Sequence, residues 1–516
     1  MNVIKDKIIY STSEPKPEPP NQPYIERLLS EINQELEDTG DRDWLVDTET
    51  GYSHTISQIE PVSRRVASAL LSLGFGPGDV LQTGYSSCLD FYWPVFGAWL
   101  CGGTVSLGDP NLSQGAIQQQ IQDTGANIVV CSFQYLDKYQ QLIQELKNKG
   151  HSLRLFVLDA KLDEDLPHGI SSFVILLEFE EKCSMVRQYK YNAENIACVF
   201  WSSGSTGNPK GILHSNQNLH NVNLGKDISP KKILISVIMF HIGGFAFGLS
   251  LGVFGGAVVN FIKEKCFSGE NWFQVAEKFQ PEHVFCGVSQ YILISNVKSS
   301  GWNLDGIKKI TPLGGAVSPG CSLKVLKKVG PQATLWEMYG STEVMFVSKQ
   351  EVGKIEFGLL GNLGAGVEVY IQDIKTGEKL DPMTEGKIMV KTKNMMLKYL
   401  NRPKDTEEFF DLNGFGYIGD VGYYDNSGRL FFSYRMREVL KVDNYWFGPA
   451  EIENLLEKEP DIFEACVWGD YDPKTGNDQV INNAGYKIYK SSEQYDFLEI
   501  MKKQHTNLNL LYIFLT

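Results

Sequence analysis

The chain has 516 residues, which is too long for one hydrophobic core, so we expect a large body and at least one smaller domain. Its composition, 42% hydrophobic and 21% charged residues, is typical of a soluble globular protein. The formal net charge of -14 argues against a general nucleic-acid-binding protein, because such proteins usually carry a basic face. A polyphosphate ligand is still compatible with this charge, since local donors decide such binding.

The cysteines and the N-terminal segment suggest no chemistry of their own. Nine cysteines are scattered through the sequence without a Cys-x-x-Cys pair, and no secretory leader is recognisable. We therefore expect reduced core residues in a cytosolic type of compartment. Residues 1–23, which include a Pro-rich part, are expected to form a loosely packed arm.

The first 160 residues alternate between helical and strand patterns. Apolar residues recur at helical spacing in three segments, and short β-rich runs lie between and after them. The helical segments are 24–36, 52–73 and 91–100, and the strand-like runs are 80–84, 104–107, 128–132 and 153–158. This alternation predicts parallel strands joined by crossover helices.

Residues 233–261 are apolar enough to pass a length test for a membrane span. His241 and six glycines interrupt this stretch, and lysines flank both of its ends, so no charge asymmetry sets an orientation. A strand, a glycine-rich turn and a buried helix explain the pattern better, and we expect no membrane span.

One loop carries the strongest chemical signal. An apolar strand pattern at residues 196–201 is followed by Ser-Ser-Gly-Ser-Thr-Gly-Asn-Pro-Lys-Gly at residues 202–211. The hydroxyl groups and the free backbone N–H groups of such a loop can bind phosphate oxygens, and Lys210 adds a positive charge. The spacing differs from a Walker A loop, because Pro209 precedes Lys210 and Gly211 follows it. A surface loop of small residues that binds nothing is the alternative.

Two smaller motifs follow downstream. His241 stands beside two glycines after a strand-like run, where a histidine is either a core residue or a site residue. Gly314 and Gly315, followed by Ala316, end another strand-like run. Successive glycines there either let a flat ring lie close to the backbone or form a tight turn.

Two further segments add groups suited to a nucleotide. In residues 336–343, Trp-Glu-Met-Tyr-Gly-Ser-Thr-Glu, Tyr339 can stack on a base, Thr342 can donate to a phosphate and Glu343 can hold Mg2+. Asp420 is suited to the paired hydroxyls of a ribose, and Arg435 follows fifteen positions later. Taken alone, charges such as these usually form a solvated face.

In this order, the motifs resemble those of the adenylate-forming superfamily, which includes acyl-CoA synthetases, firefly-type luciferases and peptide-synthetase adenylation domains. The resemblance extends from about residue 50 to about residue 480 and is closest to 4-coumarate–CoA ligase-like and luciferase-like enzymes. It rests on residues 202–211, with residues 339–343 and 419–420 as supporting matches.

The resemblance implies that ATP and a small-molecule carboxylic acid give an acyl-adenylate and pyrophosphate, after which coenzyme A displaces AMP. His241 would lie beside the carboxylate pocket, and Glu343 would bind Mg2+. Lys441 would act in the thiol-transfer step. ATP would be held by Ser202, Ser203, Gly204, Ser205, Thr206, Gly207, Lys210, Gly314, Gly315, Ala316, Tyr339, Gly340, Thr342, Asp420 and Arg435. The acyl pocket would be lined near His241, Gly314 and residues 344–346.

The fold implied is α/β. A large N-terminal domain, residues 24–433, would contain mixed and parallel sheets flanked by helices and a small β-barrel-like subdomain. A hinge at residues 434–437 would lead to a small α+β C-terminal lid at residues 438–516. The resemblance implies a cytoplasmic or peroxisomal enzyme, although the usual peroxisomal C-terminal tripeptide does not occur in this sequence.

Three departures from the family pattern lie in or near the expected lid. Tyr434 stands where the family commonly has Asp, and Asn444 stands where a glycine normally lets the pantetheine arm pass. No late lysine has the flanks of the Gly-Lys motif that serves adenylation in the family, so we expect an incomplete lid and an impaired enzyme. A non-catalytic nucleotide-binding relative and a luciferase-like monooxygenase are the two alternative functions.

Overall fold

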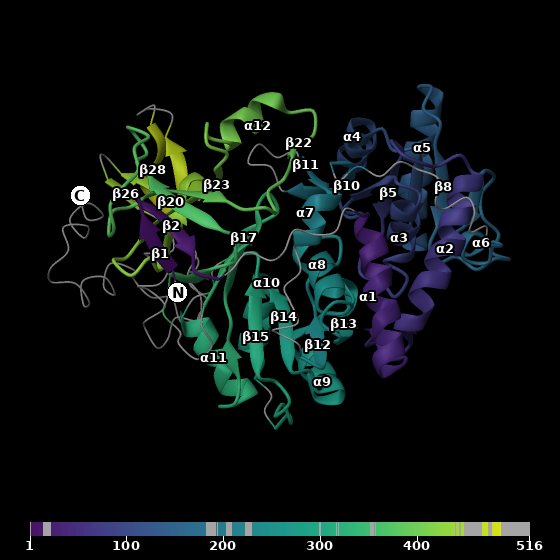
Figure 1. Cartoon of the computed structure of the whole chain (residues 1–516), viewed down its shortest axis with the longest axis horizontal. Coiled ribbons are helices and arrows are strands. Elements are labelled where there is room, and N and C mark those ends of the chain that lie inside the picture. Colours follow the sequence, from purple (N-terminus) through teal and green to yellow (C-terminus); the bar gives the residue numbers. More distant parts are fainter. Residues whose placement is uncertain are drawn as a thin grey trace.

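The computed structural model describes residues 2–13, 22–181, 192, 194–202, 209–221, 230–298, 301–315, 317, 319–350, 356, 358–438, 440–442, 445–447, 467–472 and 477–486. Within these residues the strands form three large sheets, which lie next to one another in Figure 1. The expected α/β fold class is confirmed.

The first sheet has eight strands and contains the expected alternation of strands and helices. The six strands β10, β6, β5, β7, β8 and β9 are parallel to their neighbours in the sheet. The pairs β10–β11 and β11–β22 are antiparallel. The order is β22 (Lys398–Tyr399), β11 (Lys210–Ser215), β10 (Ile196–Ser202), β6 (Thr104–Leu107), β5 (Val80–Gly84), β7 (Ile128–Cys131), β8 (Arg154–Val157) and β9 (Ile170–Ser172).

The second sheet has seven strands, and all but its last pair are parallel. Its order is β16 (Thr334–Leu335), β15 (Lys309–Leu313), β14 (His283–Gly287), β12 (Lys232–Ile235), β13 (Val258–Phe261), β3 (Asp43–Asp47) and β4 (Ser53–Thr55). Parallel strands place their carboxyl ends at the same edge of a sheet, which is where ligands bind in open α/β sheets.

The third sheet has nine antiparallel strands and contains the residues of the region where the small β-barrel-like subdomain was expected. Its order is β1 (Asn2–Lys5), β2 (Ile8–Ser11), β20 (Glu368–Gln372), β21 (Gly386–Lys391), β23 (Gly416–Tyr424), β24 (Leu430–Arg435), β19 (Leu359–Leu363), β18 (Met345–Lys349) and β17 (Met338–Ser341). Two short pairs follow, β25 (Leu440–Val442) with β26 (Tyr445–Phe447), and β27 (Val467–Asp472) with β28 (Asn477–Tyr486).

Helices cover the eight-stranded and the seven-stranded sheet (Figure 1). They are α1 (Tyr24–Thr39), α2 (Ile56–Ser72), α3 (Trp93–Leu100), α4 (Gln114–Thr124), α5 (Leu136–Asn148), α6 (Val174–Leu177), α7 (Asn216–Asn221), α8 (Ile242–Ser250), α9 (Gly269–Phe279), α10 (Val288–Asn296), α11 (Pro319–Val329) and α12 (Pro403–Phe409). The 3-10 turns within the described residues are η1 (Phe133–Tyr135), η3 (Glu264–Cys266) and η4 (Met436–Glu438).

The largest core joins the two parallel sheets through α3 and α8. All eight residues of α3 are buried, and its sequence, Trp-Pro-Val-Phe-Gly-Ala-Trp-Leu, is apolar on every side. A helix with no polar face can only lie inside a protein, so α3 and the mostly buried α8 mark the middle of the molecule. The apolar run at residues 233–261 accordingly forms β12, α8 and β13, as expected. No helix in the described part of the chain is both long and apolar enough to span a membrane.

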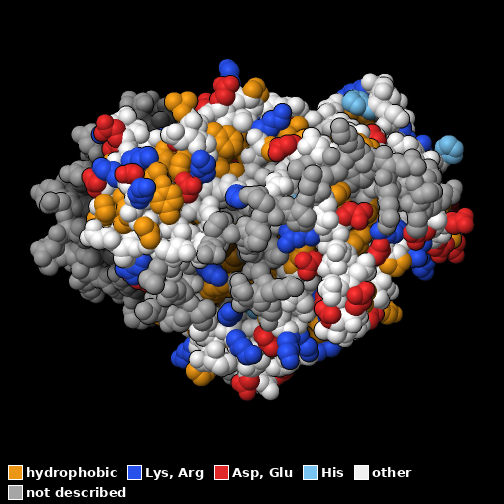
Figure 2. All heavy atoms as spheres, in the orientation of Figure 1, with side chains coloured by type: hydrophobic (Ala, Val, Ile, Leu, Met, Phe, Trp, Pro, Cys, Tyr) orange, Lys and Arg blue, Asp and Glu red, His pale blue; other side chains and the backbone are white. Residues whose placement is uncertain are grey.

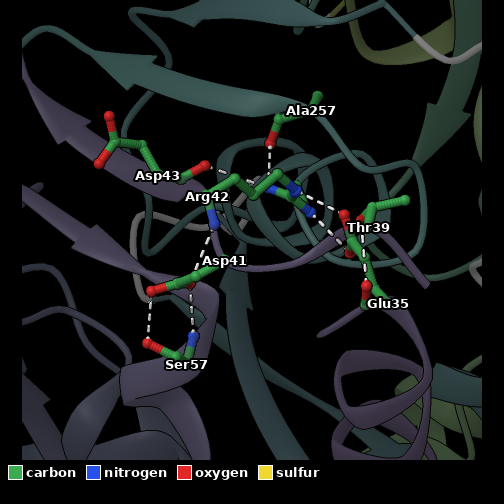
Figure 3. Close-up of polar contacts among 8 residues, drawn as sticks. Glu35, Thr39, Asp41, Arg42, Asp43, Ser57 and Ala257 are labelled. Carbon is green, nitrogen blue, oxygen red and sulfur yellow. Dashed lines mark hydrogen bonds and ion pairs between the residues drawn. The ribbon is translucent and has the colours of Figure 1, made fainter. Parts of the chain in front are cut away.

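A bidentate ion pair ties α1 to the seven-stranded sheet (Figure 3). Arg42 Nε and Nη2 lie 2.5 and 2.9 Å from the two carboxylate oxygens of Glu35, and Nη1 donates to the carbonyl oxygen of Ala257 at 3.1 Å. Both side chains are about one-fifth exposed, where such pairs are stronger than at an open surface. Next to Arg42, Asp41 accepts hydrogen bonds from the backbone N–H and the hydroxyl of Ser57, which fixes the first turn of α2.

The expectation of a loosely packed N-terminal arm is wrong for residues 2–11. Strands β1 and β2 form a hairpin, and Ile9 on β2 is opposite Val369 on β20. Ile9 is fully buried in the core of the nine-stranded sheet. The sequence pattern failed here because four-residue strands are too short to establish a period, and their partner lies more than 350 residues away.

The other face of the nine-stranded sheet is lined by aromatic rings with cations above them. Four such pairs are Lys379 over Tyr370, Lys391 over Phe415, Lys387 over Tyr417 and Arg429 over Phe431. Figure 2 shows basic and apolar side chains interspersed over this part of the molecule. Long cationic side chains thus cover ring surface that would otherwise face water.

Candidate active site

A buried carboxylate joins the predicted ribose and base residues. Tyr339 Oη on β17 donates to Asp420 Oδ2 at 2.8 Å, and Arg435 Nε lies 2.9 Å from Asp420 Oδ1. Asp420 and Arg435 are direct cross-strand partners on β23 and β24. The structure therefore brings together three residues that are up to 96 positions apart in the sequence.

A bulge in β23 places Asp420. Between the pairs Lys387–Val421 and Met389–Tyr417, the register of β23 shifts relative to β21. Gly419 within this bulge has φ of 94°, which side-chain-bearing residues rarely adopt. The bulge re-aims the side chain that follows, and the Asp420 side chain is only 1% exposed.

Within the described residues, one carboxylate oxygen of Asp420 receives no hydrogen bond, and several neighbours influence the pKa of this carboxyl group. Burial raises the pKa of Asp420, while Arg435 and the Tyr339 hydroxyl act in the opposite direction. Burial, and then the Asp420 charge, raise the pKa of Tyr339 well above its ordinary value, so its hydroxyl remains a donor. Although Arg435 Nε is close to Asp420 Oδ1, the pair lacks hydrogen-bond geometry, and no described residue donates a hydrogen bond to this buried oxygen. A buried acceptor without a donor is rare in folded proteins.

A second polar group surrounds Lys210, at the start of β11. Ser202 and Lys210 are opposite each other in the β10–β11 hairpin, and residues 203–208, which contain Ser203 to Gly207, lie outside the described residues. Lys210 Nζ lies 3.3 Å from Asp405 Oδ2 and 5.1 Å from the centre of the Tyr399 ring. The hairpin thus brings the predicted phosphate lysine to the side of β22.

The predicted metal ligand lies beside the same tyrosine. Tyr399 Oη donates to Glu343 Oε1 at 2.9 Å. Strand β22 pairs with β11 so that Tyr399 is opposite Ile212, two residues after Lys210. Lys210 and Glu343, which are 133 positions apart, therefore contact one side chain that sequence reasoning did not single out.

A buried histidine links the same hairpin to Thr342. His214 Nε2 lies 2.8 Å from the carbonyl oxygen of Thr342, and since a carbonyl can only accept, Nε2 carries the proton. Desolvation lowers the pKa of His214 to about 4, and its buried Nδ1 has no hydrogen-bond partner within the described part of the chain. His214 is therefore a neutral donor that fixes the backbone of the Thr342 segment to β11.

His241 and the two glycines lie at the carboxyl ends of the parallel strands. His241 follows β12 and stands at the N-cap of α8, while Gly314 and Gly315 follow β15. A Cβ atom added to Gly243 on α8 would lie in van der Waals range of the side chain of Leu313, the last residue of β15. His241 is exposed, yet neighbouring protein atoms lower its pKa by desolvation and Asp109 acts in the opposite direction. Gly314 and Gly315 are also exposed, and Ala316 is outside the described residues.

Gly340 was expected near ATP, and Val344 and Phe346 were expected near the acyl pocket; the structure shows what surrounds each of them. A Cβ atom on Gly340 would overlap the carbonyl oxygen of Met345, so the β17–β18 hairpin itself requires glycine there. Val344, expected near the acyl pocket, is fully buried in the core of the nine-stranded sheet. The ring of Phe346 lies against Gly364.

The expected hinge begins inside a strand. Tyr434 and Arg435 belong to β24, and Tyr434 is buried against Val421. The 3-10 turn η4 follows directly. Lys441 lies on β25, opposite Trp446, whereas Asn444 and the segment where the Gly-Lys motif was sought are outside the described residues.

Sequence reasoning missed a partly buried carboxyl group next to the site. Glu337 Oε2 accepts a hydrogen bond from Gln350 Nε2 at 2.7 Å, and burial raises the pKa of Glu337 to about 7. The only available signal was its place in the motif at residues 336–343. Among the described residues, no group of three or more His, Cys, Asp or Glu side chains could hold a metal ion. Mg2+ is usually bound by one or two carboxylates together with phosphates and water. The single carboxylate of Glu343 is therefore compatible with an Mg2+ ion whose other ligands are phosphates and water.

Comparison with known proteins identifies the family. The family described as "AMP-binding enzyme" matches residues 32–400. The 4-coumarate–CoA ligase of Pinus taeda is 26% identical over 462 residues, covering 85% of this chain and 82% of the relative.

Two solved structures share the fold. The luciferase-like enzyme from the nonluminescent mealworm Zophobas morio has a TM-score of 0.73 at 23% identity, covering 83% of this chain and 99% of that one. The amide bond synthetase McbA from Marinactinospora thermotolerans has a TM-score of 0.77 at 19% identity, covering 95% of this chain and 93% of that one. The resemblance found in the sequence is confirmed, and the chain belongs to the AMP-binding enzyme family.

Proposed function

We propose that this chain uses ATP to activate a small-molecule carboxylic acid to an acyl-adenylate and then transfers the acyl group to coenzyme A. The single observation that carries this proposal is the arrangement of two polar groups around one short segment. Tyr339 joins the segment to Asp420, and Glu343 joins it to Tyr399 beside Lys210. Thr342 lies between these two anchors in the sequence.

The nucleoside end of ATP fits the group around Asp420. Its buried Oδ1 is in ion-pair contact with Arg435 but receives no hydrogen bond from the described residues, so it is an acceptor that a ribose hydroxyl would satisfy. Tyr339 offers a ring for the base, and the exposed Gly314 and Gly315 leave open backbone at the carboxyl end of β15. Arg435 would keep Asp420 ionised despite its burial, because the two are in ion-pair contact.

The phosphate end fits the group around Lys210. Lys210 would meet the terminal phosphates, and the Thr342 segment, fixed by His214, would hold a donor near the α-phosphate. Mg2+, bound through Glu343 and the phosphates, would neutralise charge as pyrophosphate leaves. The carboxylate oxygen of the acid would attack the α-phosphorus, and the bond to the bridging oxygen of pyrophosphate would break. These residues act by alignment and electrostatics, without forming covalent bonds.

Support for coenzyme A as acceptor comes from the 4-coumarate–CoA ligases, at 26% identity. Because an amide bond synthetase shares the fold, the acceptor needs its own measurement.

The test is ATP–pyrophosphate exchange with a panel of hydroxycinnamic, benzoic and fatty acids, followed by detection of acyl-CoA. It is run on the chain as it stands and on a fusion that supplies a Gly-Lys lid motif. Carboxylate-dependent exchange with acyl-CoA formation supports the proposal. ATP binding without exchange in both forms would instead identify a non-catalytic nucleotide binder, and light emission with a luciferin would identify the monooxygenase alternative.

A further inference from the structure

The phosphate lysine of the proposed site is already paired with an anion. Lys210 Nζ and Asp405 Oδ2 are 3.3 Å apart, and their side chains are only 20% and 28% exposed. Asp405 is on α12, which lies beside β22 and β11 in Figure 1. Where a lysine has to meet phosphate, a carboxylate at this distance is a direct competitor.

The carboxylate is held in place by its own surroundings. Arg402 Nη1 also lies within ion-pair distance of Asp405 Oδ2, at 3.4 Å. Thr406 Oγ1 donates to the carbonyl oxygen of Arg402 and accepts from the backbone N–H of Tyr399. The first turn of α12 is thereby fixed to β22, so Asp405 does not depend on Lys210 alone for its position.

Resting on the proposed function, we propose that Asp405 competes with the terminal phosphates of ATP and with pyrophosphate for Lys210, and so lowers the affinity of the site for both. A polyphosphate that binds Lys210 has to displace the Asp405 carboxylate from the Lys210–Asp405 pair. The loss of this ion pair weakens polyphosphate binding. The effect is specific to ligands with β- or γ-phosphates, because Asp420 and Tyr339 would hold the nucleoside of AMP elsewhere.

The test is isothermal titration of the full chain with ATP, pyrophosphate and AMP, using the Asp405→Asn variant. Partly exposed ion pairs contribute modestly, so we expect ATP and pyrophosphate to bind about two- to fivefold more tightly. AMP affinity should not change. Glu408→Gln is the matched control, because it removes an exposed carboxylate from the same helix and should leave all three affinities unchanged. Asp405→Ser serves as the second variant if Asn at this position disturbs the fold.

A thermodynamic cycle separates competition for Lys210 from a general effect of charge. In a Lys210→Ala background, Asp405→Asn should no longer tighten pyrophosphate binding. The inference is overturned if Asp405→Asn binds pyrophosphate equally or more weakly, as expected if Asp405 orients Lys210 for its ligand. It is also overturned if the gain persists without Lys210. Failure of the unaltered chain to bind ATP would contradict the proposed function and this inference together, whereas normal binding without the gain contradicts this inference alone.

Discussion

The His214–Thr342 contact makes the stability of the protein depend on pH in a defined window. A histidine has an ordinary pKa of 6.5, and desolvation lowers that of His214 to about 4 in the folded chain. His214 therefore binds a proton less readily in the folded than in the unfolded chain. Its contribution to the free energy of unfolding is fully present above pH 6.5 and is lost as the pH falls toward 4. The difference corresponds to about 3 kcal/mol in total, of which about 2 kcal/mol is lost between pH 7 and pH 5.

Two substitutions separate the effect of His214 protonation from the effect of its hydrogen bond to Thr342. His214→Gln keeps an N–H donor near the position of Nε2, whereas His214→Leu removes it, and neither side chain titrates. Thermal unfolding at pH 7 and pH 5 should show a midpoint drop that is roughly 2 to 4 °C larger for the unaltered chain than for either variant. Glu337, with its pKa raised to about 7, contributes with the opposite sign, since its share is lost as the pH rises. It is common to all three proteins and cancels in the comparison.

The hydrogen bond should also appear in activity. His214→Leu leaves the Thr342 carbonyl without its donor, which costs about 1 to 3 kcal/mol where the group stays buried. We expect pyrophosphate exchange to fall in the Leu variant and to be largely retained in the Gln variant. Equal pH dependence of the midpoint in all three proteins would refute the reasoning.

The remaining predictions test the other contacts of the site. Asp420→Asn should weaken ATP and AMP binding about tenfold by calorimetry and leave pyrophosphate binding unchanged, because a charged acceptor for ribose is lost; equal losses for all three ligands would argue for a general structural effect. Tyr399→Phe should raise the Mg2+ concentration at half-maximal exchange about fivefold, since Glu343 loses its donor; an unchanged value would contradict this role. Gly340→Ala should lower the thermal midpoint, because the new methyl would meet the Met345 carbonyl oxygen, whereas Gly115→Ala, with open space around it, should not; equal midpoints would count against a backbone role for Gly340.

The sequence was most informative where a pattern is local. The buried helix at residues 242–250 and the strands around it follow from composition, because a segment that is apolar on every side has only one stable place. The motif residues Tyr339, Asp420 and Arg435 were identified individually, but their meeting depends on the pairing of β23 with β24 and on the bulge at Gly419.

Other contacts had no local signal. Tyr399 and Asp405 reach Lys210 only because the short strand β22 pairs with β11, almost 190 positions earlier in the chain. His214 lies in a mostly apolar strand, where a histidine is usually a core residue whose polar atoms are hydrogen-bonded locally. Its partner is a backbone carbonyl, which no side-chain pattern reveals. The N-terminal hairpin was missed for the same reason, since its place is fixed by a distant strand.

Acyl-adenylate formation at this site is tested most directly by carboxylate-dependent ATP–pyrophosphate exchange, measured for the unaltered chain, its Lys210→Ala variant and the lid fusion. We predict exchange that requires both a carboxylic acid and Mg2+ and that falls strongly when Lys210 is lost, with an intact fold by circular dichroism. The absence of exchange with every acid in both the unaltered chain and the fusion, or exchange that is indifferent to Lys210, would contradict the assignment of this site to acyl-adenylate formation.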